Sequence, residues 1–417
     1  MLRSACVLLR RGGGVFSDQS FRQFDLVPSL RAQLGFETAT AIQAKAFQSI
    51  LVGKDVSLCA ETGSGKTLAY LLPLMNRILK IKQQESSSVD LLNRSAPPVV
   101  VLCPSADLCK QVLDVARQLD RQDLVIKQWL GNSSSENSTL GGSRIRWGVS
   151  DLIVSTPAKF REDLDRFRED QLKPSTIVFD EADFLFQTAS KDSVVDILSY
   201  IRPRPRTGQS WLVQCVISSA TIPDLSSVSS ALVHKFMTAE IIRTNEFHSL
   251  PSSIETIDFI PELEANWEQR CYMLTQTLGP LVEQEKRILV FVNSQRNASI
   301  LHAFLKEKKW PVGLFKKGSE GPEDFQIIVT TDAGGRGIDW NGGVDVVINF
   351  QMPTDVVSWL HRAGRTGRLG KPGQVISFYK QKEQQLVDIL KSKVENGQPV
   401  DSLFSRKRSL RRKLRNS

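Results

Sequence analysis

Two short segments of the sequence carry residue types that bind and cleave phosphate esters. Residues 60–67 read AETGSGKT, and residues 180–183 read DEAD. The first segment fits the phosphate-loop pattern G-x4-G-K-[ST], apart from Ala60 in the first glycine position. Glycines let backbone N–H groups approach a phosphate, Lys66 suits the β- and γ-phosphates, and the Thr67 hydroxyl suits Mg²⁺. The alternative, a glycine-rich turn with an exposed lysine, is disfavoured by the strand pattern before the motif and the helix pattern after it.

The acidic segment directly follows the apolar run TIVF at 176–179. Buried carboxylates are costly unless a cation or hydrogen bonds compensate them. A nucleotide site provides that compensation, because it needs a carboxylate for Mg²⁺ and a group that orients the attacking water. Asp180 stands at the predicted strand end, where ligands bind in open α/β sheets, and Glu181 follows it. The alternative for this string alone is a solvated acidic turn.

Apolar runs alternate with amphipathic helical stretches along most of the chain. Continuous apolar runs of this kind predict parallel strands buried on both faces. They occupy 56–60, 99–103, 151–155, 176–179 and 212–218, and then 287–292, 326–330, 345–349 and 374–379. We predict two tandem α/β domains. The predicted segments are 1–17 (basic N-terminus), 18–242 (first domain), 243–256 (linker), 257–396 (second domain) and 397–417 (basic tail).

The net charge of +9 is concentrated at the two ends of the 417-residue chain. Residues 405–417 contain seven Lys/Arg and no acid, so this tail is predicted to bind nucleic-acid phosphates without sequence preference, the alternative being a solvated disordered end. Six scattered cysteines and four histidines indicate neither a disulfide framework nor a zinc site, and favour a reducing compartment. No apolar run reaches the roughly 18 residues that a membrane-spanning helix needs.

The first 17 residues, MLRSACVLLRRGGGVFS, combine arginines with apolar residues and contain no acid. This composition is typical of a mitochondrial transit peptide and predicts the mitochondrial matrix as the location. The alternative is a disordered basic end, which would leave the nucleus, the nucleolus or the cytoplasm as the location.

The motifs together resemble the DEAD-box RNA helicases of helicase superfamily 2. In that family, alanine in the first phosphate-loop position is usual. Seven further blocks follow in the family's order: GFETATAIQ (35–43), PSADLC (104–109), TPAK (156–159), SAT (219–221), VFVNS (290–294), TTDAGGRGID (330–339) and HRAGRTGR (361–368). The resemblance covers about residues 21–390. It implies two RecA-like domains, each a mainly parallel sheet flanked by helices, that close on ATP and single-stranded RNA.

The resemblance also assigns roles at the nucleotide site, with ATP and Mg²⁺ as cofactors. Asp180 and Thr67 would hold Mg²⁺, Glu181 would act as general base, and Arg365 and Arg368 would be arginine fingers. The residues implied to contact the nucleotide are Phe21 and Gln43 at the adenine, Ala60, Glu61, Thr62, Gly63, Ser64, Gly65, Lys66 and Thr67 at the phosphates, and Gly337 and Asp339 on the ribose side. Ordinary packing is the alternative role for Phe21 and Gln43.

Two further sets follow from the resemblance. The residues implied to couple hydrolysis to domain closure are Asp183, Ser219, Thr221, His361 and Arg362. The residues implied to contact RNA phosphate and sugar, without sequence preference, are Pro104, Ser105, Gly131, Thr156, Pro157, Lys159, Asn293, Thr330, Thr331 and Gly334. For the RNA set the alternative is that each is an ordinary loop residue at a strand end.

Most departures from the family pattern lie on the RNA side. Ala106 and Asp107 replace the usual Arg and Glu, and Lys159 replaces an Arg. Gly334-Gly335 stands where two alanines are usual, which predicts a looser backbone. Segment 314–325 lacks the family's helix, and the eight residues 318–325 are fewer than the roughly 10–12 that a parallel crossover needs. An incomplete gene model is an alternative explanation for that gap.

The sequence therefore favours an RNA-stimulated ATPase that locally unwinds or remodels RNA. It is predicted to act as a monomer, with mitochondrial ribosome assembly as the candidate process and assembly factors as candidate partners. The alternative is an ATP-dependent RNA clamp or assembly scaffold with little unwinding activity, which the departures on the RNA side motivate. A DNA helicase is a weaker third hypothesis.

Overall fold

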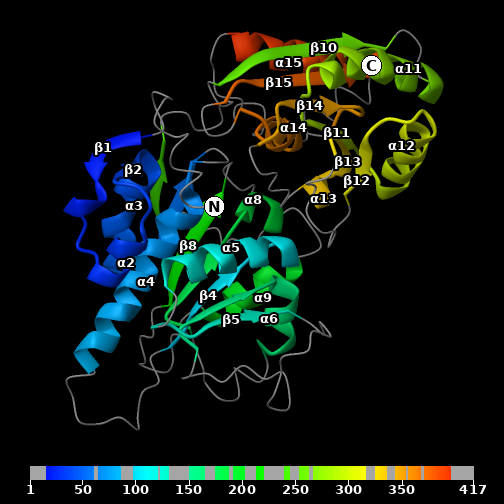
Figure 1. Cartoon of the computed structure of the whole chain (residues 1–417). Helices are drawn as coiled ribbons and strands as arrows, with labels where there is room; N and C mark the ends of the chain where they lie inside the picture. The colour runs from blue at the N-terminus through cyan, green and yellow to red at the C-terminus, as the bar shows by residue number, and fades with distance from the viewer. Residues whose placement is uncertain are drawn as a thin grey trace.

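We describe a computed structural model of the chain (Figure 1). The structure describes residues 16–60, 64–85, 97–120, 123–130, 150–164, 174–186, 191–201, 213–219, 239–244, 253–262, 266–315, 325–335, 343–353, 356–367 and 371–395. Within these ranges, no helix combines the length and the apolar character that crossing a bilayer requires.

The first domain is built on a seven-stranded sheet in the order β5-β6-β4-β7-β8-β3-β9. Every neighbouring pair in it is parallel, so all carboxyl ends lie along one edge. Its strands are β3 (Val56–Cys59), β4 (Val99–Leu102), β5 (Ile126–Trp129), β6 (Leu152–Ser155), β7 (Thr176–Phe179), β8 (Gln214–Ser219) and β9 (Glu240–Arg243).

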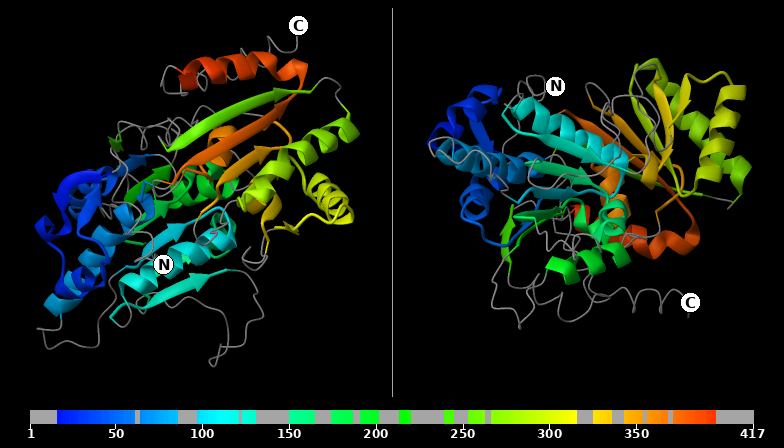
Figure 2. Two further views of the ribbon diagram at one scale, coloured as in Figure 1. Left: turned by 45° about the horizontal axis from the view of Figure 1, so that its top comes forward. Right: turned by 90° about the horizontal axis from the view of Figure 1, so that it is seen from below.

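Helices cover both faces of this sheet, as the right panel of Figure 2 shows for α5 and α9. Alternate strand residues point to opposite faces, so Val99 and Val101 enter one core while Val100 and Leu102 enter the other. The first core receives α3 (Ala41–Leu51), α4 (Lys66–Glu85) and α5 (Ala106–Leu119). The second receives α6 (Pro157–Glu162), α8 (Ala182–Leu185) and α9 (Lys191–Ile201).

A small N-terminal unit packs beside α3 and α4. Strand β1 (Phe16–Ser20) pairs antiparallel with β2 (Thr38–Thr40), and η2 (Phe21–Gln23) and α2 (Pro28–Gln33) lie between them in the chain. Helix α4 anchors this unit, because the Asn76 side chain accepts from the Val27 amide (2.8 Å) and donates to the Asp25 carbonyl (2.8 Å).

The second domain contains a six-stranded sheet in the order β10-β15-β14-β11-β13-β12, with all neighbours parallel. Its strands are β10 (Ile254–Pro261), β11 (Ile288–Val292), β12 (Val312–Leu314), β13 (Ile327–Thr331), β14 (Val346–Asn349) and β15 (Gly373–Tyr379). Helices α11 (Trp267–Glu283) and α12 (Gln295–Glu307) pack on one face, and α14 (Val356–Ala363) and α15 (Gln384–Glu395) pack on the other. Figure 1 shows α14 and the short α13 (Asp332–Gly335) on the side that faces the first domain.

The predicted fold class is confirmed, since each domain is a parallel sheet covered by helices. The sequence runs missed β5, β9, β10 and β12, which lie at the sheet edges and are short or partly exposed. The expectation that the segment after 314 is too short for a crossover was wrong. Strand β12 pairs parallel with β13, and the whole connection 315–326 joins them, of which 316–324 lies outside the described residues.

Several strands extend across the predicted domain boundaries. Strand β1 begins at Phe16, inside the segment 1–17 predicted to be a separate basic end. Strand β9 reaches Arg243 and β10 begins at Ile254, so both extend into the predicted linker 243–256. The basic tail 397–417 lies outside the described residues.

Candidate active site

The phosphate loop joins β3 to α4 at the carboxyl edge of the first sheet. Gly65 has a φ of +89°, and a Cβ there would lie 2.4 Å from Gln43 Nε2, so this position requires glycine. Lys66 is buried, and its Nζ donates to the Ala60 carbonyl oxygen at 2.7 Å. The described end of the loop is therefore closely packed at Gly65, and the Lys66 side chain reaches back to Ala60. Glu61, Thr62 and Gly63 lie outside the described residues.

Gln43 reaches this loop from the start of α3. The backbone N–H of Thr40 donates to Gln43 Oε1 (2.9 Å), and the backbone N–H of Gln43 donates to Thr40 Oγ1 (3.5 Å). Together these two hydrogen bonds form a capping box. Gln43 Nε2 then donates to the Gly65 carbonyl oxygen (3.3 Å). The structure thus brings Gln43 to the phosphate loop, while its contact with adenine stays a prediction.

Phe21 does not present a free ring face. Its side chain is buried, and its ring meets those of Phe24 and Phe36 edge-on, with centroid distances of 5.3 Å in both cases. Phe24 in turn stacks on Phe47 of α3. In this conformation the ring of Phe21 is part of the core, so the structure does not support its predicted stacking on adenine.

Asp180 follows β7, which is separated from β3 only by β8. Tyr70 Oη donates to Asp180 Oδ2 (2.9 Å), and the Glu181 amide donates to Oδ1 (3.1 Å). Burial and the charge of Glu181 raise the pKa of Asp180 to about 6, although the Ser218 side chain, the Tyr70 hydrogen bond and the charge of Lys66 act in the opposite direction. Negative charge is therefore incompletely compensated at this strand end.

Glu181 has a φ of +49° and a ψ of +49°, in the left-handed region that non-glycine residues seldom occupy. It caps the single-turn helix α8, which directs Asp183 into the structure, where it is 1% exposed. The Phe184 amide donates to Asp183 Oδ1 at 3.0 Å. The sharp turn from strand to helix therefore leaves Asp180 against Tyr70 and brings the carboxylates of Glu181 and Asp183 near each other.

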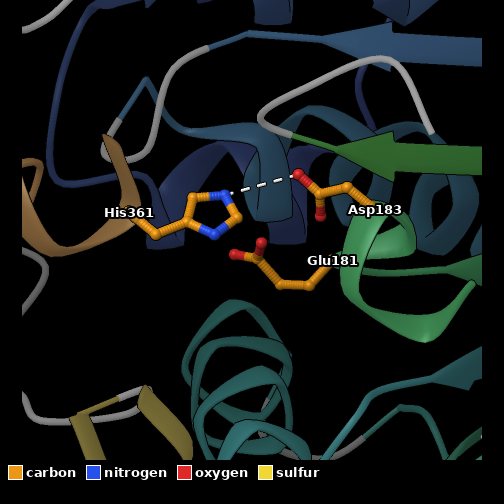
Figure 3. Close-up of side chains that lie close together, drawn as sticks. All are labelled: Glu181, Asp183 and His361. Carbon is orange, nitrogen blue, oxygen red and sulfur yellow. Dashed lines mark ion pairs between the residues drawn. The ribbon is translucent and has the colours of Figure 1, made fainter. Parts of the chain in front are cut away.

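His361, at the end of α14, crosses to this motif from the second domain. Figure 3 shows its imidazole directed at Asp183, with Glu181 beside the same ring. His361 Nε2 lies 3.3 Å from Asp183 Oδ2. One side-chain nitrogen or carboxylate oxygen from each of the three residues lies within 4.8 Å of the other two. Burial lowers the pKa of His361, but the attraction of Asp183 and Glu181 outweighs burial and leaves it raised. The predicted interdomain role of His361 and Asp183 agrees with this contact.

Ser219 lies on β8, between β7, which precedes the DEAD motif, and β3, which precedes the phosphate loop. It ends β8, and its carbonyl oxygen accepts from the Ala60 amide at 3.3 Å. Its side chain is fully buried. This position is compatible with coupling between the two motifs, which stays a prediction. Thr221 lies outside the described residues.

Arg365 lies one turn beyond His361. Burial lowers the pKa of Arg365, and the charges of Glu181 and Asp332 oppose that effect because both attract its guanidinium. The structure thus brings one predicted arginine finger within the electrostatic reach of the predicted general base. Arg368, Gly337 and Asp339 lie outside the described residues.

Arg362 was predicted to contact the other domain, and the structure corrects this. Its guanidinium is 1% exposed, and all five N–H donors are used inside the second domain. They bind Asp332 Oδ1 (2.7 Å) and Oδ2 (2.8 Å), Asn293 Oδ1 (2.7 Å), Asn349 Oδ1 (3.3 Å) and the Gln351 carbonyl (2.8 Å). Arg362 therefore holds three motifs of one domain together.

The predicted RNA residues of the first domain gather at one edge of its sheet. They follow β4 and β6, which are neighbours, and so begin α5 and α6 at the carboxyl edge: Pro104, Ser105, Thr156, Pro157 and Lys159. Ser105 uses its hydroxyl to accept from the Leu108 amide (3.3 Å) as the helix cap. The shared position is as expected, whereas their contact with RNA stays a prediction. Gly131 lies outside the described residues.

Lys159 has partners in the protein itself. Its Nζ lies 2.7 Å from Glu162 Oε2 and 5.9 Å from the centroid of the Trp129 ring. The hydrogen bond from Lys159 to Glu162 raises the pKa of Lys159. The lysine is therefore a fixed positive charge at this edge.

The predicted RNA residues of the second domain are largely committed to internal contacts. Asn293 Oδ1 accepts from Arg362, and its Nδ2 donates to the Met352 carbonyl at 2.8 Å. Thr330 is fully buried and donates to the Phe315 carbonyl at 3.1 Å. Thr331 is buried and accepts from the amide of Gly334, itself buried (3.4 Å). In this conformation the Thr330 side chain is inaccessible to RNA, so that predicted contact is not supported.

The Gly334-Gly335 pair does not loosen the backbone at Gly335 as predicted. A Cβ at Gly335 would lie 2.5 Å from Phe291 Cε1, because the aromatic ring fills that space. The centroid of the same ring lies 5.2 Å from the Arg362 guanidinium carbon. Gly335 is therefore required by close packing against an aromatic residue.

Sequence reasoning missed several residues that build the site. Tyr70 contacts Asp180, and Asp332, Asn349 and Gln351 bind Arg362. Asp332 lies inside a recognised motif, and Asn349 is the one polar residue that ends the apolar run 345–349, so both had a weak signal. Tyr70 had none, since an aromatic residue in an apolar helix normally indicates core.

The described residues fit a magnesium nucleotide. A buried lysine lies over a phosphate loop, and a carboxylate with a raised pKa lies nearby, where a cation would stabilise its charge. Carboxylate and hydroxyl oxygens are ligands that Mg²⁺ prefers, so Asp180 and Thr67 are its candidate holders. Glu181, His361 and Arg365 complete a charged cluster that draws on both domains.

Comparison with known proteins identifies a family match for each of the two domains. Residues 40–228 match the family "DEAD/DEAH box helicase", and residues 269–370 match "Helicase conserved C-terminal domain". The chain is 27% identical over 392 residues to DEAD-box ATP-dependent RNA helicase 39 of Arabidopsis thaliana, covering 89% of this chain and 60% of the relative. It is 30% identical to the pre-mRNA-processing ATP-dependent RNA helicase prp5 of Aspergillus niger, covering 88% of this chain and 31% of the relative.

Solved structures resemble the whole arrangement. S. cerevisiae Dbp5 bound to RNA and ADP BeF3 has a TM-score of 0.67 at 20% identity, covering 90% of this chain and 93% of that one. Mss116p bound to ssRNA and AMP-PNP has a TM-score of 0.72 at 19% identity, covering 89% and 76%. At these identities the likeness establishes the fold alone.

The fold and the site together define a nucleotide-dependent helicase core of two tandem RecA-like domains. The chain belongs to the DEAD-box RNA helicase family, as the sequence resemblance implied. It spans from about a third to 60% of the length of the two curated relatives named above.

Proposed function

We propose that this protein is an ATP-dependent RNA helicase, which hydrolyses ATP when RNA is bound and locally unwinds or remodels RNA. The observation that carries the proposal is the meeting of the two domains at one point. Asp183 and Glu181 of the first domain contact or attract His361 and Arg365 of the second. A hydrolytic site divided in this way works only when the domains are closed.

Each residue has a defined part in hydrolysis. Lys66 would bind the phosphates, and Asp180 and Thr67 would hold Mg²⁺, which when bound would supply charge stabilisation at the phosphoryl group. Glu181 accepts a proton from the attacking water, and the strained turn at its backbone fixes its direction. Arg365 adds positive charge from the second domain, where a guanidinium fork suits a phosphoryl group.

RNA binding would couple to this site through domain closure. The first-domain RNA edge, formed by the starts of α5 and α6, lies at the carboxyl ends of β4 and β6. The DEAD motif follows β7, which pairs with β4 in the same sheet. Contacts to phosphate and sugar along such an edge are independent of base sequence. RNA that spans both domains would thereby favour the arrangement in which Arg365 faces Glu181.

The test is ATP hydrolysis by the purified chain with and without single-stranded RNA. We expect RNA to stimulate turnover, and we expect Glu181→Gln to reduce it on the order of a hundredfold or more, because the general base is lost. ADP affinity should be unchanged in that variant. Turnover that is independent of both RNA and Glu181 would contradict the proposal.

Strand displacement separates unwinding from clamping. A helicase separates a short RNA duplex in the presence of ATP, whereas a clamp or scaffold binds RNA with ATP and leaves the duplex intact. The comparisons favour the helicase, since the relatives named above are RNA helicases by description. ATP-dependent RNA binding with no strand separation would identify the clamp.

We further propose that the protein acts as a monomer in the mitochondrial matrix, with ribosome assembly as its process. The acid-free, arginine-containing segment 1–17 supports matrix targeting. Fluorescence of a full-length C-terminal fusion, compared with a fusion that lacks residues 1–15, would test the location. Nuclear, nucleolar or cytoplasmic signal from the full-length fusion would contradict it, and light scattering would test the monomer.

A further inference from the structure

Tyr70 occupies an unusual place for a core aromatic residue. It lies on α4, one helical turn after Thr67, and its side chain is fully buried. Its hydroxyl donates to Asp180 Oδ2 at 2.9 Å, although the two residues are 110 positions apart in the chain. A phenylalanine would fill the same space in the core but would leave that oxygen without its donor.

The Tyr70 hydroxyl also has a second neighbour. Burial raises the pKa of the Tyr70 hydroxyl, whereas the Thr67 side chain is close enough to lower it, so the phenol that donates to Asp180 also lies near Thr67. These are the two residues that the sequence assigns to Mg²⁺. A single oxygen atom thus links the helix that carries the hydroxyl ligand to the strand that carries the carboxylate ligand.

The Tyr70 hydroxyl is a hydrogen-bond donor to Asp180, since a phenol carries its proton at physiological pH. Hydrogen bonding to the charged form of a carboxylate stabilises that form, which opposes the effect of burial on Asp180.

The remaining contacts of Asp180 leave the carboxylate little freedom. The Glu181 amide donates to Oδ1 (3.1 Å), while Tyr70 occupies Oδ2. The amide contact belongs to the adjacent residue and turns with the backbone. Tyr70 therefore ties the direction of the carboxylate to α4, and the Ser218 side chain of β8 is a second group from another element that stabilises the charged form of Asp180.

We propose that Tyr70 is a positioning residue that holds Asp180 and Thr67 in the arrangement that accepts a magnesium nucleotide. The inference rests on the proposed nucleotide site. It goes further by giving Tyr70, in the second turn of α4, a role in the magnesium dependence of nucleotide binding. This role is distinct from that of Lys66 and the loop, which is to bind phosphate. Tyr70 acts through Asp180 and touches neither the nucleotide nor the reacting atoms.

The experiment measures ADP affinity of the full chain by calorimetry, with Mg²⁺ and with EDTA. The variant is Tyr70→Phe, which removes one oxygen and keeps the buried ring. The matched control is Tyr379→Phe, which removes the hydroxyl of a buried tyrosine at the end of β15 in the other domain. The readout is the ratio of the two affinities, which does not depend on turnover or on the fraction of protein that is folded.

We expect Tyr70→Phe to bind ADP without Mg²⁺ within about twofold of the wild type. The enhancement by Mg²⁺ should fall about tenfold, the effect of losing a hydrogen bond to a charged group. A purely structural role for Tyr70 would change both affinities alike or neither. Tyr379→Phe should keep the wild-type ratio.

The outcomes separate this inference from the proposed function. A Tyr70→Phe protein with the wild-type Mg²⁺ enhancement would overturn the positioning role while leaving the nucleotide site intact. A wild-type chain that binds no ADP in the presence of Mg²⁺ would overturn the proposed function, and this inference with it. If Tyr70→Phe unfolds at 25 °C by circular dichroism, the same ratio is measured at 10 °C, where the same outcomes decide.

Discussion

The two sheet edges that meet at the domain interface treat their charged groups in opposite ways. At the first, Asp180 is buried with a pKa raised to about 6, and Lys66 donates to a backbone carbonyl of its own loop. At the second, Arg362 is just as buried, yet each of its donors has an acceptor within the same domain. At the first edge the negative charge is incompletely compensated. At the second edge the hydrogen bonds of the buried charge are complete without a ligand.

The difference shows that a motif residue's charge does not reveal its role. Charges at the first edge are arranged for a ligand, because a cation and phosphates would supply the missing compensation. The charge of Arg362 is structural, because it binds the segments that carry Asp332 and Asn293 to α14. His361 and Arg362 are adjacent in sequence and have opposite roles, one between the domains and one within a domain.

The largest expected effect comes from removing Arg362. Arg362→Ala would remove the donors of the partly buried Asp332 carboxylate and of the buried Asn349 oxygen. We expect the unfolding free energy of the second domain to fall by about 3–5 kcal/mol, as for a broken buried ion pair. Urea denaturation of the full chain, followed by hydrogen exchange in each domain, measures this loss and locates it.

Two further variants sharpen that prediction. Arg362→Lys should recover only part of the stability, because a single ammonium cannot reproduce the planar fork. Arg296→Ala removes an exposed arginine of the same domain and should change stability by no more than about 0.5 kcal/mol. Equal stability of Arg362→Ala and Arg296→Ala would mean that the second edge is not held by this network.

A smaller loss of stability is expected from Gly335→Ala. The new methyl group would lie against the ring of Phe291, at 2.5 Å and 2.8 Å from its nearest atoms. Overpacking of this kind destabilises by about 1–3 kcal/mol. Thermal unfolding should show the loss in Gly335→Ala and a partial recovery in the double variant with Phe291→Leu. Additive effects in the double-mutant cycle would contradict the contact.

The ion pair between the domains should make closure depend on pH. Asp183 raises the pKa of His361 in the closed arrangement above its ordinary value of about 6.5. The contribution of the pair is therefore complete below about pH 6.5 and is lost as the pH rises through the raised value. Energy transfer between labels on the two domains, measured from pH 6 to 9, should report more closure at the acid end. A His361→Gln protein should lose that dependence, and an unchanged pH profile would rule out the pair.

The smallest effect is expected at the RNA edge of the first domain. Lys159→Ala should weaken RNA binding similarly for all sequences and reduce the slope of log affinity against log salt by about one. Fluorescence anisotropy with two unrelated RNAs measures both properties. Glu162→Gln releases Lys159 from its ion pair and is expected to leave the slope unchanged or steeper. A sequence-dependent loss in Lys159→Ala would argue for base recognition at this edge.

The sequence could predict those parts of the molecule in which a residue type has a single physical explanation for its position. Lys66, Gly65 and Asp180 lie at strand ends because apolar runs mark parallel strands, and parallel strands place their ends together. Edge strands such as β5 escaped prediction because their side chains are partly exposed and their pattern is mixed. The β12–β13 pair escaped because residue count alone does not show where a crossover begins.

The roles of charged and small residues inside the second domain required coordinates. Arg362 has the same residue type as an arginine finger, and only its five acceptors show that it is internal. The need for glycine at 335, at the end of α13, depends on the ring of Phe291, which lies 44 positions earlier in the chain on strand β11. Tyr70 likewise acquires its role from a contact with a distant strand.

The central claim is that the hydrolytic site is shared between the domains, and Arg365→Ala tests it most directly. The measurement is ATP turnover of the full chain with saturating RNA, together with ADP affinity in the presence of Mg²⁺. The account predicts wild-type ADP affinity and a loss of RNA-stimulated turnover on the order of a thousandfold, as for a missing arginine finger. Undiminished RNA-stimulated turnover in Arg365→Ala would contradict it.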